Sequence, residues 1–208
     1  MKRAGVAADT SPSTEERMLA AARACLLRSG YAAVSTRAVA EEAGVPLSQI
    51  HYYFGSKRQL LLTVLESENA RLLERQRALY AGPELLSVKW QRACDYLDED
   101  LHSGYVRILH ELWGQSYSDP DLAVALREAI SGWHELLAGV IDRAFAQNVL
   151  QRLGLTPAGV AALLVASFLG AEIEILLGLK ESQVPHRGTL RNIGRWIEAN
   201  ERRPGSNG

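Results

Sequence analysis

Residues 30–57 read GYAAVSTRAVAEEAGVPLSQIHYYFGSK, and this segment carries the strongest structural signal in the chain. Two short helices that cross steeply need a small residue where they touch, a glycine that can adopt a left-handed turn, and an aliphatic residue that fills the core. Ala40, Gly44 and Ile50 occupy these places, and Val45 follows the turn as a further expected core residue. The spacing predicts a helix-turn-helix, although an ordinary helical hairpin can carry the same pattern.

The second of these two helices carries side chains suited to a DNA groove. Its apolar residues Ile50 and Phe54, four positions apart, are expected to point inward. The flanks and outer face are then formed by Leu47, Ser48, Gln49, His51, Tyr52 and Tyr53. Glutamine can read an adenine edge, serine is adaptable, leucine can contact a thymine methyl group, and tyrosine or histidine can bind phosphate oxygens. The alternatives are that Tyr53 packs over the first helix and that Gln49 and Tyr52 are simply solvated.

Groups that can bind phosphate flank the two short helices. Ser35 and Thr36 stand at a helix N-terminus, where backbone N–H groups favour an anion. Arg37 and Lys57 add positive charge on either side of the unit. The first 60 residues hold eight Lys and Arg against five Asp and Glu, whereas the remainder holds 15 against 19. This asymmetry favours a polyanion-facing N-terminal end on an acidic body.

The same segment resembles the DNA-binding signature of the TetR family of transcriptional regulators. The most specific matches are Ala-Gly-Val at 43–45 and Tyr-Phe-Gly-Ser-Lys at 53–57. The resemblance implies a homodimer that places one recognition helix per subunit in successive major grooves of a palindromic operator, with half-sites about 34 Å or more apart. Two residues differ from the usual family pattern. Pro46 replaces a serine found in many members, and His51 replaces a phosphate-binding tyrosine.

The remaining sequence predicts an all-α protein, because the 3.6-residue period recurs and no strand alternation is present. Capping boxes at Ser13–Glu16 and Ser56–Gln59 begin two helices, and Gly30 is expected to end the first. We expect about nine helices, near residues 14–28, 36–43, 47–53, 57–80, 84–101, 104–116, 121–147, 157–179 and 188–201. The first three form a helix-turn-helix DNA-binding domain, and the others form a helical ligand-binding and dimerisation domain.

The chain is expected to divide into four parts. Residues 1–12 are polar, lack the apolar stretch of a signal peptide, and are predicted to form a disordered tail. The helix-turn-helix domain is expected at 13–56, the effector-binding and dimerisation domain at 57–203, and a second disordered tail at 204–208.

The helix expected near 157–179 is apolar enough to resemble a membrane span. It contains Glu172 and Glu174, however, so a helix that faces a protein partner is favoured over a span. One stripe of this helix repeats every four residues: Ala162, Ala166, Gly170 and Glu174. Small residues allow a second helix to approach closely, and the family resemblance implies that the last two long helices form a four-helix dimer interface.

A candidate effector site lies on the middle helices. The residues proposed for it are Tyr105, His110, Trp113, Tyr117, Trp133 and Glu172. As a set they suit a cavity for a planar or lipophilic compound, of the kind that the resemblance implies, although each aromatic residue taken singly can be ordinary core. The Glu172 carboxylate could receive a cationic ligand or, as the favoured structural interpretation, could be paired with Arg107 or Arg143.

Other function classes have little support in the sequence. The Glu99–His102 spacing of a di-iron site occurs once, without the second copy that such a site needs, and no glycine-rich phosphate loop or nucleophile elbow is present. Cys25 and Cys94 have no disulfide-framework or metal-site spacing, which suits a reducing cytoplasm. We therefore expect a cytoplasmic, non-enzymatic protein with no cofactor, metal or membrane partner.

The function predicted from the sequence is a dimeric transcriptional regulator. Its expected partners are a double-stranded DNA operator, a second copy of itself and a small-molecule effector that releases it as a repressor. The alternatives are an activator of the same fold and a non-catalytic helical interaction protein. The last alternative would leave the helix-turn-helix and its flanking cations unexplained.

Overall fold

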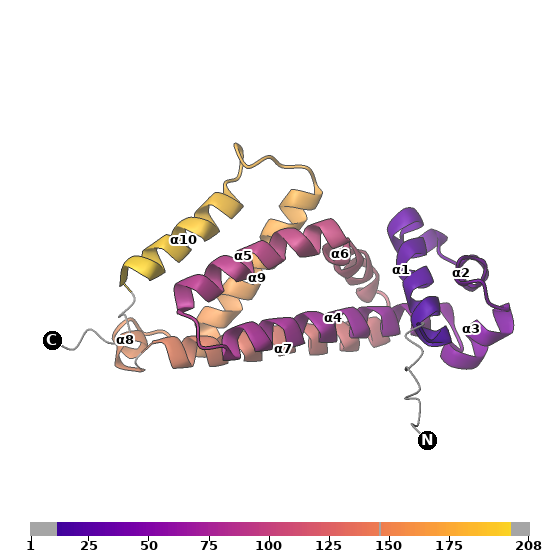
Figure 1. Ribbon diagram of the computed structural model, residues 1–208, viewed down its shortest axis with the longest axis horizontal. Helices are drawn as coiled ribbons and strands as arrows, with labels where there is room; N and C mark the ends of the chain where they lie inside the picture. The colour runs from indigo at the N-terminus through magenta and orange to yellow at the C-terminus, as the bar shows by residue number, and fades with distance from the viewer. Residues whose placement is uncertain (1–11, 146, 201–208) are drawn as a thin grey trace, which may run out of the picture. The chain divides into compact units, whose positions relative to one another are not determined.

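A computed structural model describes residues 12–145 and 147–200, so the predicted tails, apart from Pro12, lie outside the described residues. The described part contains ten α-helices and no strand, which confirms the all-α prediction (Figure 1). The helices are α1 (Thr14–Ala33), α2 (Thr36–Ala43), α3 (Leu47–Phe54), α4 (Lys57–Ala81), α5 (Leu86–Ser103), α6 (Tyr105–Ser116), α7 (Pro120–Ala144), α8 (Gln147–Arg152), α9 (Pro157–Leu176) and α10 (His186–Asn200).

Two compact units make up the chain, and the division between them falls inside α4, after Val64. In the first unit, α1 begins at the predicted capping box. The Ser13 hydroxyl accepts from the Glu16 N–H at 3.1 Å, and the Glu16 carboxylate accepts from the Ser13 N–H at 2.7 Å. Gly30 interrupts the helix where expected, because its backbone is not helical, with a φ of 73° and a ψ of 168°. A short helical segment follows this kink and carries α1 to Ala33.

The predicted helix-turn-helix is formed by α2 and α3, which pack against each other, with α1 packed on α2. Ala40 and Ile50 are buried, and Gly44 adopts the left-handed conformation with a φ of 64° and a ψ of 38°. The Gly44 N–H caps the carbonyl of Glu41 at 3.3 Å, and the Val45 N–H reaches the carbonyl of Ala40 at 3.0 Å. Val45 is only half-buried, so it contributes less to the core than its position suggested.

The second unit is a packed set of helices in which α7 contacts α6 and α9, and α5 contacts α6 and α10. The two prolines expected in first helical turns, Pro120 and Pro157, begin α7 and α9, and their caps are the side chains of Asp119 and Thr156. The helix expected at 121–147 is shorter than predicted. It ends at Ala144, and the separate short helix α8 follows, which accounts for ten helices where about nine were expected.

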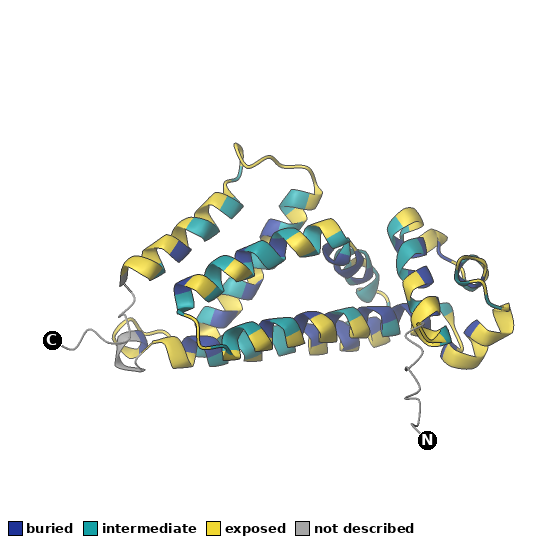
Figure 2. Ribbon diagram, in the orientation of Figure 1, coloured by how far each residue is buried: buried dark blue, intermediate teal, exposed yellow. Residues whose placement is uncertain are grey.

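The last helix is attached to α5 by specific hydrogen bonds. The Trp90 indole N–H donates to the Leu190 carbonyl at 2.7 Å, and the Gln91 side-chain amide donates to the Arg191 carbonyl at 3.1 Å. The Arg191 guanidinium also lies 3.0 Å from the Asp95 carboxylate. These contacts fix α10 along one side of α5. Sequence periodicity could not have predicted this pairing. Figure 2 shows how the buried positions alternate with exposed ones along these helices.

Candidate DNA-binding surface and effector cavity

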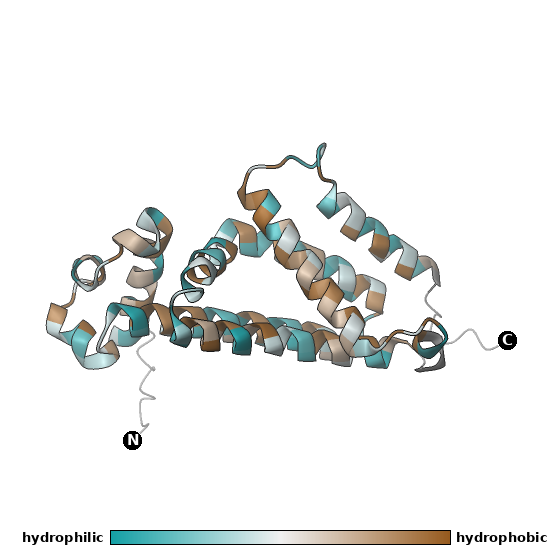
Figure 3. Ribbon diagram, turned by 180° about the vertical axis from the view of Figure 1, so that it is seen from behind, coloured by the Kyte–Doolittle hydropathy of each residue, from teal (hydrophilic) through white to brown (hydrophobic). Residues whose placement is uncertain are grey.

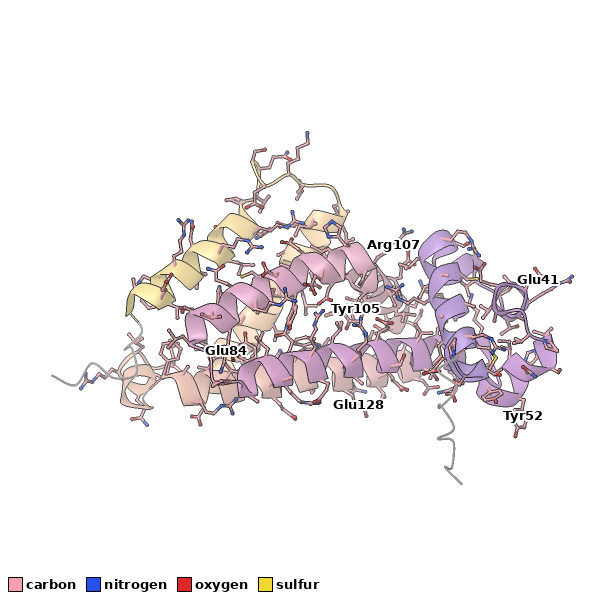
Figure 4. The ribbon with its side chains drawn as sticks, in the orientation of Figure 1. Glu41, Tyr52, Glu84, Tyr105, Arg107 and Glu128 are labelled. Carbon is pink, nitrogen blue, oxygen red and sulfur yellow. The ribbon has the colours of Figure 1, made fainter. Side chains whose placement is uncertain are left out.

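The outer face of α3 is exposed, whereas its inner face is buried. Ile50 has no exposed surface and Phe54 is 7% exposed. On the other side, Tyr52 is 84% exposed and projects away from α3 (Figure 4). The remaining predicted residues of this face are also exposed: Leu47, Ser48, Gln49, His51 and Tyr53. The structure therefore places all six predicted side chains where a groove could receive them.

The Tyr53 ring is not buried over the preceding helix, because 45% of it is exposed. It meets the Tyr52 ring edge to face, with ring centroids 5.4 Å apart and planes at 81°. On its other side it lies 6.2 Å from the Phe54 ring. This geometry favours the outer-face interpretation of Tyr53 over the packing alternative.

His51 is oriented by the end of its own helix. Gly55, with a φ of 69°, closes α3 through a 3.0 Å hydrogen bond from its N–H to the His51 carbonyl. The Gly55 carbonyl in turn lies 3.3 Å from the His51 Nδ1. A carbonyl can only accept, so Nδ1 carries the proton and the Nε2 atom of the neutral ring has none to donate. A phosphate contact through Nε2 therefore requires the protonated imidazolium.

Lys57 has a structural contact that the sequence did not indicate. Its ammonium donates to the carbonyls of Tyr31 at 2.6 Å and Ala32 at 3.3 Å, and it lies 4.7 Å from the centroid of the Tyr31 ring. Burial lowers the pKa of the Lys57 ammonium. The side chain thus caps the C-terminal end of α1 and ties it to the start of α4, and one of its three N–H groups is left for another partner.

The start of α2 combines a helix cap with exposed charge. The Ser35 hydroxyl accepts from the Ala38 N–H at 3.1 Å, and Thr36 beside it is half-buried. Arg37 lies 3.1 Å from Glu41 in an ion pair whose side chains are 82% and 69% exposed. Such exposed pairs contribute little stability, so Arg37 can exchange Glu41 for a phosphate at small cost.

A cavity of about 110 Å³ lies within the second unit. Of the six predicted effector residues, Tyr105, Trp133 and Glu172 line it. His110 stands behind the wall, 3.3 Å from the Glu172 carboxylate. The apolar wall of the cavity is formed by Ala93, Leu97, Leu109, Ala129, Ile130, Leu137, Val165, Phe168 and Leu169.

Two of the predicted effector residues lie away from the cavity. The Trp113 indole N–H donates to the Tyr117 hydroxyl at 3.0 Å, and Tyr117 is 83% exposed. The two side chains therefore satisfy each other at the surface, one helical turn apart, and neither is a lining residue of this cavity. Helical period alone did not distinguish this outward pair from the inward-facing Tyr105.

Polar residues on α4 complete the cavity wall, and sequence reasoning missed them. Asn69, Gln76 and Tyr80 line the cavity, and the first two are buried. Their signal was available in the sequence, because the two amides lie seven residues apart on the same, otherwise apolar face of α4.

Asn69 and Gln76 differ in how their polar atoms are satisfied. The Asn69 Oδ1 accepts from the Tyr105 hydroxyl at 3.3 Å and from the Trp133 indole at 2.9 Å. The buried Oε1 of Gln76 has no hydrogen-bond partner among the described residues. Burial raises the pKa of Tyr105 and raises the pKa of Tyr80 to about 12, so both phenols stay neutral donors.

Two carboxylates line the cavity, each in contact with one basic side chain, and they are close enough to repel each other. Asp100 lies 2.6 Å from Arg75, and Glu172 lies 3.3 Å from the Nε2 of His110. Burial raises the pKa of Asp100, an effect that the Arg75 guanidinium only partly offsets. The partner of Glu172 is therefore a histidine, and the expectation of an ion pair with Arg107 or Arg143 is corrected.

The small-residue stripe of α9 is exposed at Ala162, Ala166 and Gly170. Large apolar residues beside it are exposed as well, including Leu163 at 68% and Leu177 at 76%. Figure 3 shows this hydrophobic face of α9. By length and composition α9 could span a membrane, a test that core helices of soluble proteins and signal sequences also pass.

Glu174, the last residue of the predicted stripe, has a partner within the chain. It is half-buried and lies 2.5 Å from the Nε2 of His186 at the start of α10. This contact links the ends of the two helices that carry the exposed apolar residues. Glu172 and Glu174 therefore have different partners, His110 and His186.

Comparison with known proteins agrees with this geometry. The family described as "Bacterial regulatory proteins, tetR family" matches residues 18–64, which cover most of α1, all of α2 and α3, and the start of α4. No significant match occurs among curated protein sequences.

Many solved structures share the fold. A TetR transcription regulator from Haloarcula marismortui aligns with a TM-score of 0.72 and 18% identity over 90% of this chain and 97% of its own. A transcriptional regulator from Saccharomonospora viridis, crystallised with choline, aligns with a TM-score of 0.69 and 23% identity over 90% and 98%. FadR from Bacillus subtilis, in complex with stearoyl-CoA, aligns with a TM-score of 0.68 and 14% identity over 89% and 98%.

The family pattern thus lies on the helix-turn-helix itself, and the fold of solved tetR-family regulators continues through the helices that follow. With both parts in place, the chain combines a match to the tetR family of bacterial regulatory proteins over residues 18–64 with the fold of solved tetR-family transcription regulators.

Proposed function

We propose that the protein is a dimeric cytoplasmic repressor that binds a palindromic operator and is released by a small molecule in the cavity of its second unit. The observation that carries the DNA-binding part is the exposed outer face of α3 on a buried helix-turn-helix core. A core helix would not leave Tyr52 84% exposed beside buried Ile50 and Phe54.

Base reading and phosphate binding are assigned to different residues. Leu47, Ser48 and Gln49 lie in the first turn of α3 and are proposed to read base edges. The proposed phosphate contacts are Ser35, Thr36, Arg37, His51, Tyr52, Tyr53 and Lys57. Since α3 contains no Lys or Arg, few charges meet the backbone, and we expect a shallower salt dependence than a strongly basic DNA-binding protein shows.

Dimerisation is assigned to the exposed apolar face of α9 with the neighbouring face of α10. Ala162, Ala166 and Gly170 allow a partner helix to approach closely, and the large apolar side chains beside them supply area to bury. Trp196 of α10 is 60% exposed and offers further apolar surface to a partner. A large exposed apolar surface of this kind marks a protein interface.

Release by an effector is assigned to the cavity and to α4. In the relatives crystallised with choline and with stearoyl-CoA, this fold accommodates ligands of very different size. In this chain α4 carries Asn69 and Gln76 in the cavity wall, and Lys57 at its start caps α1. The helical rise puts Lys57 and Asn69 about 18 Å apart along one continuous helix.

A ligand that moves α4 would shift the protein between two conformers. Changing operator occupancy from nearly full to nearly empty requires about 5.5 kcal/mol of difference in ligand affinity between the two conformers. A single cavity with several polar contacts can supply a difference of this size.

The proposal is tested by selecting binding sites from a pool of random duplexes with the purified protein. We expect an enriched sequence with two-fold symmetry and half-sites spaced by one helical turn or more. Wild-type enrichment should disappear in a variant with Gln49, Ser48 and Leu47 all changed to alanine, with folding monitored by circular dichroism. Recovery of no common sequence from the wild type would favour the interaction-protein alternative.

A further inference from the structure

We infer that the cavity of the second unit takes a small organic cation, an ammonium compound that also carries one hydrogen-bond donor. This inference rests on the proposed effector role of the cavity and names the chemical class of ligand. Charge, aromatic surface and one unpartnered buried acceptor support it independently.

The charge of the wall favours a cation. Among its lining residues are two carboxylates, Asp100 and Glu172, and no Lys, Arg or His. Arg75 compensates Asp100 from outside the lining. The only hydrogen-bond partner of Glu172 among the described residues is His110, which contacts one oxygen of the carboxylate. An ammonium group beside Glu172 would therefore complete a charge pair, whereas a carboxylate or phosphate would meet repulsion.

Aromatic rings surround the same space. Tyr80, Tyr105, Trp133 and Phe168 all line the cavity. The faces of such rings attract a desolvated cation, and a quaternary ammonium group is a recognised occupant of an aromatic box. The hydroxyl of Tyr105 and the indole N–H of Trp133 are already directed to Asn69, so these rings are held by hydrogen bonds before any ligand arrives.

Gln76 supplies the second element of recognition. Its side chain is 7% exposed, its Oε1 is buried without a partner, and it lies in the cavity wall. An acceptor in this position calls for an O–H or N–H donor from the occupant. The structural alternative, a plain core position, would leave this oxygen permanently unsatisfied.

The volume limits the size of the ligand. A cavity of about 110 Å³ is smaller than the roughly 150 Å³ engineered cavity that holds benzene. The cavity as it stands therefore suits a small compound of about the size of benzene or less. Choline is close to this size, carries a quaternary ammonium group and one hydroxyl donor, and serves as the probe.

The test compares three compounds of nearly the same shape by isothermal titration calorimetry with the full chain. Choline is positive, 3,3-dimethylbutan-1-ol is its neutral carbon isostere, and 3,3-dimethylbutanoate is negative. We expect choline to bind at least tenfold more tightly than the alcohol, and the acid to show no binding. Because all three compounds are measured on the wild-type protein, this comparison does not depend on the folding of any variant.

Two substitutions locate the recognition. Glu172→Gln should remove the preference for choline over the alcohol, whereas Glu128→Gln, on the exposed side of α7, should leave it unchanged. Gln76→Leu should weaken choline about tenfold and leave tetramethylammonium, which has no donor, unaffected.

The outcomes separate this inference from the proposed function. Equal affinity for choline and the alcohol, or no binding by any of the three compounds, would overturn the inference even if the protein binds its operator. Choline binding that responds to Glu172→Gln without releasing operator DNA would uphold the inference and refute effector release.

Discussion

The unpartnered oxygen of Gln76 makes an unusual prediction, which is that replacing this residue with leucine stabilises the empty protein. Gln76 lies on the buried face of α4, where its Oε1 has no hydrogen-bond partner and its neighbours in the cavity wall are mostly apolar. Leaving a buried polar atom unsatisfied costs about 1–3 kcal/mol. Leucine has a similar volume and no polar atom, so Gln76→Leu should recover about 1–2 kcal/mol of that free energy.

The measurement is urea and thermal unfolding at one fixed protein concentration, because dimer stability depends on concentration. A gain of 1 kcal/mol shifts the midpoint by about 2–4 °C in a chain of this size. We therefore expect an unfolding midpoint about 2–8 °C higher for Gln76→Leu, with an unchanged urea m-value.

Gln91 provides the matched control. Its side-chain amide donates to the Arg191 carbonyl at 3.1 Å, so Gln91→Leu breaks a real hydrogen bond between α5 and α10. This control should lose about 1 kcal/mol. If Gln76→Leu destabilises the protein as much as Gln91→Leu does, then Gln76 has a structural partner, and the reasoning about the cavity is refuted.

Further predictions concern DNA binding, dimerisation and the ligand. Gln49→Ala should relax base preference at one or two operator positions. Lys57→Ala should weaken binding to all sequences alike and lower the unfolding midpoint, since its ammonium caps α1. If anisotropy shows a uniform loss of DNA affinity in both variants, the assignment of base reading to Gln49 and phosphate binding to Lys57 is contradicted. Ala166→Glu should weaken dimerisation at least a hundredfold in sedimentation equilibrium, and an intact dimer would exclude α9 from the interface. Choline affinity should fall on acidification, starting above the ordinary aspartate pKa near 4, because burial raises the pKa of Asp100 and its protonation leaves the positive charge of Arg75 unbalanced beside the cavity; a flat profile would show that the charge of Asp100 does not influence binding.

The helix-turn-helix could be predicted from the sequence because its constraints are local. A left-handed turn at Gly44 and buried contacts at Ala40 and Ile50 depend on residues only four to ten positions apart. The same local reasoning identified the exposed face of α3, since burying Ile50 and Phe54 leaves only one outward side on a helix of two turns.

Contacts between distant segments could not be predicted in this way. The ammonium of Lys57 reaches the carbonyl of Tyr31, 26 residues earlier, and nothing in the sequence specifies that pairing. Likewise, periodicity assigned Tyr105 and Tyr117 to one effector site, whereas the structure places only Tyr105 at the cavity. A pattern identifies the apolar face of each helix, but the helix that lies opposite is set by packing across the whole unit.

Helix ends were also partly missed, for a related reason. Gly30 interrupts α1 as expected, but the short helical segment that follows it up to Ala33 was not predicted. The break between α7 and α8, after Ala144, follows neither a proline nor a glycine in the sequence, so no local signal marked it.

The central claim is that the exposed face of α3 reads a specific DNA sequence. Its most direct test is fluorescence anisotropy of the purified protein on labelled DNA from upstream of its own gene, with a scrambled duplex of the same composition, at 50 and 200 mM salt. We predict tight binding to one palindromic fragment at both salt concentrations, and binding at least a thousandfold weaker to the scrambled duplex, the lower end of typical specificity ratios. Equal affinity for the upstream fragment and for its scrambled counterpart would contradict the claim.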